Sequence, residues 1–233
     1  MPQDINFKSL IRPGWEALKT YWIPFISVQL FGVGIVVTYY TYPSFQNFCD
    51  LLGDLKNQGG VAFAALATLM SGGIIPEIIK SFLRPQHLPK PTRLEILHQI
   101  SIFPASGVLV DLFYRLQTII FGESDHWVTI LCKVSLDQFV FTPFLALPFV
   151  ITWFLWREHE FCLISALKAL SWRLYLQRIL PILIPNFFYW IPMTAIIYSL
   201  PSAVQFPMFL CANCGWSLIL IFIARRQIEH IKN

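Results

Sequence analysis

The sequence predicts an all-α protein, a polytopic bundle of transmembrane helices that forms one membrane domain over residues 1–233. Its composition, with 56% hydrophobic, 16% aromatic and only 13% charged residues, is far from that of a soluble domain. About six apolar stretches reach the ~20 residues that a helix needs to cross a bilayer. They lie at 22–42, 60–80, 97–121, 128–155, 178–200 and 204–224. These spans and their short loops leave no room for a soluble catalytic domain.

The basic residues predict how these spans are oriented. If the amino terminus lies inside, 14 of the 17 lysines and arginines fall on the inner side, the side that such residues favour. They are Lys8, Arg12, Lys19, Lys80, Arg84, Lys90, Arg93, Arg157, Lys168, Arg173, Arg178, Arg225, Arg226 and Lys232. Of the other three, Lys56 falls in an outer loop, and Arg115 and Lys133 fall within spans. Both termini are therefore predicted on the inside.

The first stretch, 22–42, is expected to remain in the protein as a span. Polar and basic residues run as far as Lys19, the apolar stretch is too long for a signal peptide, and no small-residue cleavage site follows it. An Arg- and Ser-rich transit peptide is also lacking. The second stretch, 60–80, is expected to be a buried packing helix, because small residues allow a close approach of helices. Its glycines are Gly59, Gly60, Gly72 and Gly73. Three prolines make 84–93 a linker.

Charged side chains inside the third and fourth stretches are the first candidates for function, since a charge within a bilayer normally faces a cavity or a partner. Asp111 and Arg115 are four residues apart, share one helical face and can pair. Asp137 and Gln138 lie deep in 128–155, with Lys133 one turn earlier. These residues line a polar pathway, or they are neutralised clamps that hold helices together. The sequence leaves both alternatives open.

Prolines shape the second half of the chain. Pro143 and Pro148 should kink the long stretch 128–155, and the carbonyls they free need partners inside the bundle. Further prolines in 178–200 and at Pro201 would permit gating. Between them, 158–178 has apolar residues at helical spacing and basic residues along it, which predicts an amphipathic helix at the inner surface.

Catalytic and metal-binding chemistry is not expected. The five histidines are scattered, without the spacing of a metal site, and neither a serine elbow nor a phosphate-binding loop is present. Glu158, His159 and Glu160 are expected to form a solvated loop, because adjacent residues project in different directions. Cys211 and Cys214 have a Cys-x-x-Cys spacing but lie in an apolar helix, so they are interpreted as packing residues. We predict no enzyme, no cofactor, no metal and no nucleic-acid partner.

Three motifs resemble the Mpv/PMP family of peroxisomal and mitochondrial inner-membrane proteins. Asp137 and Gln138 followed by Pro143 look like its Asp-Gln-x-x-x-x-Pro motif. Upstream, Pro104, Gly107, Tyr114, Arg115 and Gly122 resemble its Gly-Pro-to-Asp-Arg-to-Gly helix. The carboxyl-terminal pattern is similar at Asn186, Trp190, Pro192, Tyr198, Pro201 and Trp216. The resemblance covers 104–216. Departures at Tyr114, Ile196, Ile197, Gln205 and Ser217 indicate a divergent relative.

The resemblance implies a small multi-pass membrane protein that forms a weakly selective channel for small solutes. The alternative is a structural or scaffold protein without transport activity, in which Asp137 and Arg115 pair inside the protein. The expected partners are the lipid bilayer, small solutes and, for a wide pore, further copies of the chain. The lack of a transit peptide favours a bacterial cytoplasmic membrane over a mitochondrial inner or peroxisomal membrane.

Overall fold

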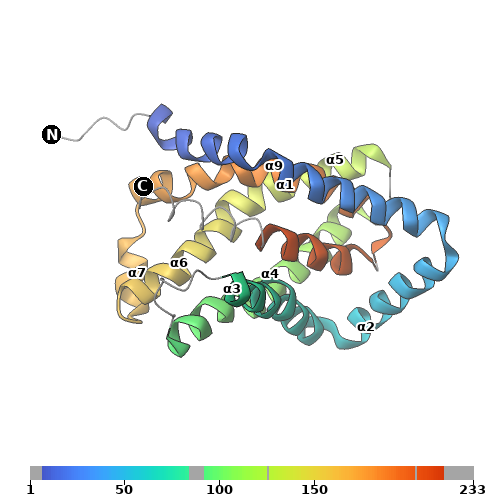
Figure 1. Cartoon of the computed structure of the whole chain (residues 1–233), viewed down its shortest axis with the longest axis horizontal. Helices are drawn as coiled ribbons and strands as arrows, with labels where there is room; N and C mark the ends of the chain where they lie inside the picture. The colour runs from blue at the N-terminus through green and yellow to red at the C-terminus, as the bar shows by residue number, and fades with distance from the viewer. Residues whose placement is uncertain (1–6, 84–91, 125, 203, 218–233) are drawn as a thin grey trace.

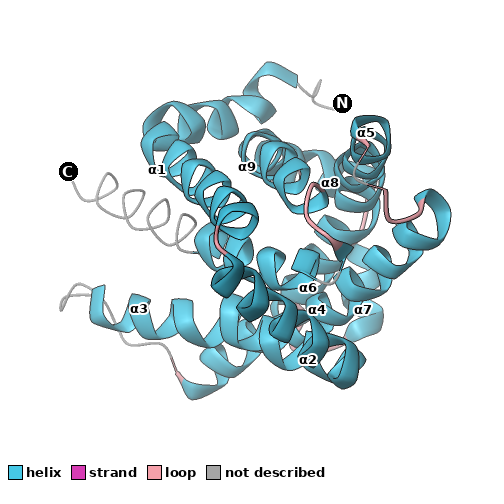
Figure 2. Ribbon diagram, turned by 90° about the vertical axis from the view of Figure 1, so that its right-hand side faces the viewer, coloured by secondary structure: helices cyan, strands magenta, loops and turns pink. Residues whose placement is uncertain are grey.

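The computed structural model describes residues 7–83, 92–124, 126–202 and 204–217. This part of the chain is all helical and has no strand, as the sequence predicts. Figures 1 and 2 show two layers with the helical residues 204–217 between them. One layer holds α1 (Phe7–Thr41), α5 (Trp127–Leu136) and α9 (Leu180–Tyr198), and the other holds α2 (Pro43–Thr68), α3 (Ile75–Leu83) and α4 (Arg93–Phe121).

Several of these helices are apolar enough to cross a membrane. Three segments meet the required length and composition, namely Pro43–Ile79, Arg93–Phe121 and Trp127–Glu158. The pair Trp172–Arg178 and Ile182–Tyr198, bent by 63°, would make a fourth span, and Ile26–Thr41 is a shorter apolar helix. Only 28% to 33% of the residues in the most apolar window of each long segment are buried inside the chain. Much of their apolar surface faces outward, which fits a bilayer better than water.

The predicted spans agree with this picture in part. Four of them largely coincide with the three long segments and the bent pair, namely 60–80, 97–121, 128–155 and 178–200. In place of 22–42, the helix α1 extends from Phe7 to Thr41. Of the last predicted span, 204–217 is helical and 218–224 lies outside the described residues.

The loop predicted around Lys56 is wrong, because the structure has a helix there. Pro43 begins α2, where its fixed φ suits the first turn and no N–H is needed. The helix continues through Lys56 to a kink at Gly60, whose φ of 53° and ψ of −133° only glycine adopts readily. The kink lies where the predicted span 60–80 begins. The segment Pro43–Ile79 has 37 residues, about 55 Å of helix, well beyond a ~30 Å hydrocarbon core.

Small residues bring α2 and its continuation close to α4. The π-helical segment η1 (Leu69–Ile74) joins α2 to α3 and buries Gly72 and Gly73 against Phe103 of α4. Gly107 of α4 lies against Ala64 and Thr68 of α2. The predicted packing role of this stretch is therefore confirmed at Gly72 and Gly73.

The fourth predicted span is one long helix with a widened middle. α5 continues through the π-helical segment η2 (Asp137–Ala146) into α6 (Leu147–Glu158). Instead of a sharp kink, Pro143 lies inside η2, and its carbonyl accepts a hydrogen bond of 3.1 Å from the Tyr175 hydroxyl. Pro148 lies at the start of α6, directly after η2. The Pro143 carbonyl thus has a partner inside the bundle, as the sequence predicts for carbonyls near the prolines.

The single amphipathic helix predicted over 158–178 is also wrong. The chain turns sharply at Glu160 and Phe161, which have φ of 52° and 62°, and then forms two short helices, α7 (Leu163–Ala169) and α8 (Trp172–Arg178). Between them, the Ser171 hydroxyl accepts a hydrogen bond from the N–H of Leu174 at 3.2 Å and starts α8. Of the predicted linker 84–93, residues 84–91 lie outside the described part of the chain. Thr92 and Glu95 cap α4 reciprocally.

Candidate functional site

The four polar residues predicted at span depth form two groups. The first group lies between α2 and α4 around the fully buried Asp111. Arg115 Nε donates to Asp111 Oδ2 at 2.8 Å, so the predicted pair forms. The ammonium of Lys56 adds an ion pair of 3.2 Å to Asp111 Oδ1. We call Lys56, Asp111 and Arg115 the α2–α4 clamp.

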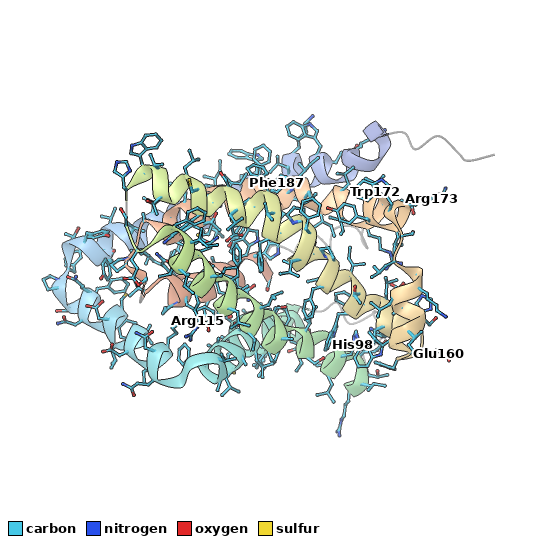
Figure 3. The ribbon with its side chains drawn as sticks, turned by 180° about the vertical axis from the view of Figure 1, so that it is seen from behind. His98, Arg115, Glu160, Trp172, Arg173 and Phe187 are labelled. Atoms are coloured by element: carbon cyan, nitrogen blue, oxygen red, sulfur yellow. The ribbon has the colours of Figure 1, made fainter. Side chains whose placement is uncertain are left out.

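The clamp holds one more positive charge than negative charge. The Lys56 side chain is 11% exposed, whereas that of Arg115 is 47% exposed. Figure 3 labels Arg115 on α4. Because a buried carboxylate is stable only with partners, the two cations neutralise Asp111, and the Lys56 ion pair joins α2 to α4. Sequence reasoning missed Lys56, although its isolation as the single basic residue between the first two spans was a signal.

The second group surrounds Asp137 at the start of η2, and the carboxylate is 7% exposed. Tyr198 of α9 donates to Asp137 Oδ2 at 2.6 Å, and Gln138 Nε2 donates to Oδ1 at 2.9 Å. Asn186 Nδ2 in turn donates to Gln138 Oε1 at 3.5 Å. We call these four residues the central polar cluster. π-Helical turns are rare in proteins overall, and those that occur often lie at functional sites. The position of Asp137 at the start of η2 therefore supports a functional role for the cluster.

Two buried polar side chains, Lys133 and Gln117, lie beside this cluster. Lys133 is 2% exposed, and its ammonium lies 6.0 Å from the centre of the Tyr198 ring. No carboxylate of the described residues comes within 4 Å of that ammonium; Glu123 attracts it from farther away. Gln117, 1% exposed, donates through Nε2 to the Lys133 carbonyl at 3.1 Å, but its Oε1 is buried without a partner. Such atoms are costly in an apolar interior unless water or a solute binds them.

The clamp and the central polar cluster are separate in the structure. No hydrogen bond or ion pair between described residues joins them. The α4 and η2 helices instead meet through Phe113 and Phe141, whose rings stack with centroids 4.0 Å apart. A single pathway through Asp111, Arg115, Asp137 and Gln138 therefore has no direct contact between its two halves.

Residues of the family-like motifs meet in the interior. Asn186 joins Gln138, and the Tyr189 hydroxyl donates to the Ala212 carbonyl at 2.6 Å. Trp190 packs against Phe209 and Trp216 in the hairpin that Pro201 turns. The other motif residues are Pro104 and Gly107 inside α4, Pro143 inside η2 and the exposed Pro192 of α9. Trp190 and Trp216 thus pack against neighbouring rings in this hairpin.

His98 forms a further buried cluster that sequence reasoning passed over. Its Nε2 lies 3.2 Å from the Trp153 carbonyl, and Trp153 Nε1 donates to the His98 carbonyl at 3.2 Å. The rings of Trp153, Phe154, Trp156 and Phe161 surround the imidazole. Figure 3 labels His98 near the end of α4 opposite to Arg115. A signal was present in Trp153 and Trp156, which lie three residues apart on one helical face.

The residues weighed as metal ligands make separate contacts. Glu158 binds Arg178 through two hydrogen bonds of 2.8 Å, and His159 Nδ1 lies 2.9 Å from the Ser165 hydroxyl. Cys211 and Cys214 are free thiols. Across the described residues, no group of three or more His, Cys, Asp or Glu side chains could hold a metal ion.

Comparison with known proteins adds no relative. No protein-family model matches the chain, and neither a curated protein nor a solved structure matches it significantly. The fold and the site by themselves define the class: in its described residues the chain is all helical, with three or four apolar helices that could span a membrane and polar groups buried between them.

Proposed function

We propose that the chain is a multi-pass membrane protein of the Mpv/PMP type that conducts small solutes with weak selectivity through the central polar cluster. The observation that carries this proposal is the buried, unpartnered Gln117 Oε1 beside the Lys133 ammonium, which no carboxylate of the described residues approaches within 4 Å. A polar solute or a file of water would satisfy both atoms. The remaining polar groups, on η2 and α9, would line its path.

The path proposed here differs from the one the sequence suggests, because it leaves out the clamp. Lys133, Asp137 and Gln138 belong to α5 and η2, and Tyr198 and Asn186 belong to α9. A single bundle of this size lines only a narrow path, so a wider pore would require several copies of the chain. The host membrane that we propose is a bacterial cytoplasmic membrane.

Single-channel recording in planar bilayers tests this proposal. The purified native chain is expected to give discrete currents, and Asp137→Asn is expected to change their conductance or ion selectivity severalfold, because it removes the charge at the proposed path. Arg115→Gln is the matched control: it also removes one charge from a predicted span but lies in the clamp, so its currents should be close to native.

Silence of the native chain over a range of voltages and pH would contradict the conducting role. It would favour the second candidate, a scaffold membrane protein without transport activity. The observation that favours this candidate is the clamp itself, in which Lys56 and Arg115 both bind Asp111 and the Lys56 ion pair holds α2 to α4. A scaffold predicts that substitutions at Asp137 and Arg115 only lower stability.

We also propose six spans with both termini on the inner side. Reporter enzymes fused after Ser124 and after Glu160 are then expected on opposite sides of the membrane, outside and inside, because the helix Trp127–Glu158 separates them. A fusion after Phe82 supplies an inside reference. If the reporters fused after Ser124 and after Glu160 are found on the same side of the membrane, the proposed topology is wrong.

A further inference from the structure

A groove between α1 and α9 has the chemistry of a lipid site. Its volume is about 420 Å³, within the ~300–1,000 Å³ of pockets that hold small molecules. Figure 1 shows the two helices running side by side. Six residues of α1 and one of α9 line the groove, namely Trp15, Leu18, Lys19, Trp22, Ile26, Gln29 and Phe188. We call it the α1–α9 groove.

The groove residues of α1 form one stripe. Positions 15, 19, 22, 26 and 29 follow each other at intervals of four and three, which places them on a single helical face. Trp15, Trp22 and Ile26 are 45%, 54% and 48% exposed, so the described chain covers only part of the stripe. The ring of Phe188 meets that of Trp15 edge to face at 6.1 Å and forms the opposite wall.

The groove has one charged end and one closed end. The Lys19 ammonium lies 5.8 Å from the centre of the Trp15 ring, and no carboxylate of the described residues comes within 4 Å of it. Arg12, by contrast, is neutralised by Glu16 at 2.6 Å. At the other end, Gln29 Nε2 donates to the Tyr189 carbonyl at 2.6 Å. The groove therefore offers one unneutralised cation above aromatic and aliphatic walls.

This order of side chains matches the depth profile of a phospholipid. Lys19 and the tryptophans suit the headgroup level, and Ile26, seven residues or about 10 Å further along the helix, suits the acyl chains. Since Lys19 has no counter-ion among the described residues, an anionic headgroup complements it better than a zwitterionic one. We propose that the α1–α9 groove binds one anionic phospholipid, with its phosphate at Lys19 and an acyl chain against Trp22, Ile26 and Phe188.

Native mass spectrometry of the full chain in detergent micelles tests this site. Phosphatidylglycerol is expected to bind more tightly than phosphatidylcholine with the same acyl chains. Lys19→Gln is expected to weaken phosphatidylglycerol about fivefold, the usual contribution of one basic residue near an anionic lipid surface, and to abolish the preference. Trp22→Ala, a change on the exposed wall, should weaken both lipids.

Arg12→Gln is the matched control. It removes the same charge seven residues away on the same helix, but Arg12 already binds Glu16, so the preference for phosphatidylglycerol should persist. Inorganic phosphate, which carries the charge without the acyl chain, should not displace the lipid. Equal binding of both lipids by the native chain, or a preference that survives Lys19→Gln, would overturn the proposal. Dimers that exclude lipid from the groove would assign it to a second copy instead.

Discussion

Replacement of Asp111 by alanine is expected to lower the free energy of unfolding by about 3–5 kcal/mol, the cost of leaving a buried charge without its partner. Asp111 is fully buried, and the Lys56 side chain is only 11% exposed, so the lysine cannot simply turn toward water. Arg115 is less affected because nearly half of its side chain is exposed. Denaturant unfolding of the purified chain in one fixed detergent measures the loss.

A double substitution distinguishes a broken clamp from general damage to the fold. Lys56→Met combined with Asp111→Ala removes both buried charges and keeps an apolar stem of similar length at position 56. Since apolar residues often replace a buried ion pair at little cost, the double variant should recover most of the stability that Asp111→Ala loses. A double variant as unstable as Asp111→Ala would show that the ion pair to Lys56 does not account for the loss.

Gly107→Ala is expected to lower the stability by about 1–3 kcal/mol, the usual cost of overpacking. A methyl group there would lie 2.5 Å from the Ala64 carbonyl oxygen, and this backbone atom cannot move aside as a flexible side chain could. α2 would have to separate from α4. That shift would also lengthen the ion pair between Lys56 and Asp111, so both contacts between the helices weaken together.

The matched control is Gly34→Ala. Gly34 lies inside α1, and a methyl group there meets nothing within 4 Å. Because alanine favours a helix over glycine by ~1 kcal/mol, this change should be neutral or stabilising. Unfolding of both variants under the same conditions gives the comparison. A Gly107→Ala variant as stable as Gly34→Ala would mean that α2 and α4 do not pack as closely as the structure has them.

The helical class and the position of several apolar segments could be predicted because both depend on neighbouring residues. Length and apolar composition indicate Arg93–Phe121 and Trp127–Glu158 directly. The pairing of Asp111 with Arg115 was predictable for the same reason, since it follows from a spacing of four residues on one helix. Local signals misled at 158–178, where apolar periodicity continues across Ser171 although the chain breaks into α7 and α8.

The sequence by itself determined which residues are apolar, which are charged at span depth and which could pair within one helix. Only the tertiary structure decided that Lys56 reaches Asp111, that Tyr198 and Asn186 complete the cluster around Asp137 and Gln138, and that His98 lies among aromatic rings. These contacts join residues up to 63 positions apart in the chain. Their formation depends on how separate helices pack, and helical periodicity describes only the face that each helix presents.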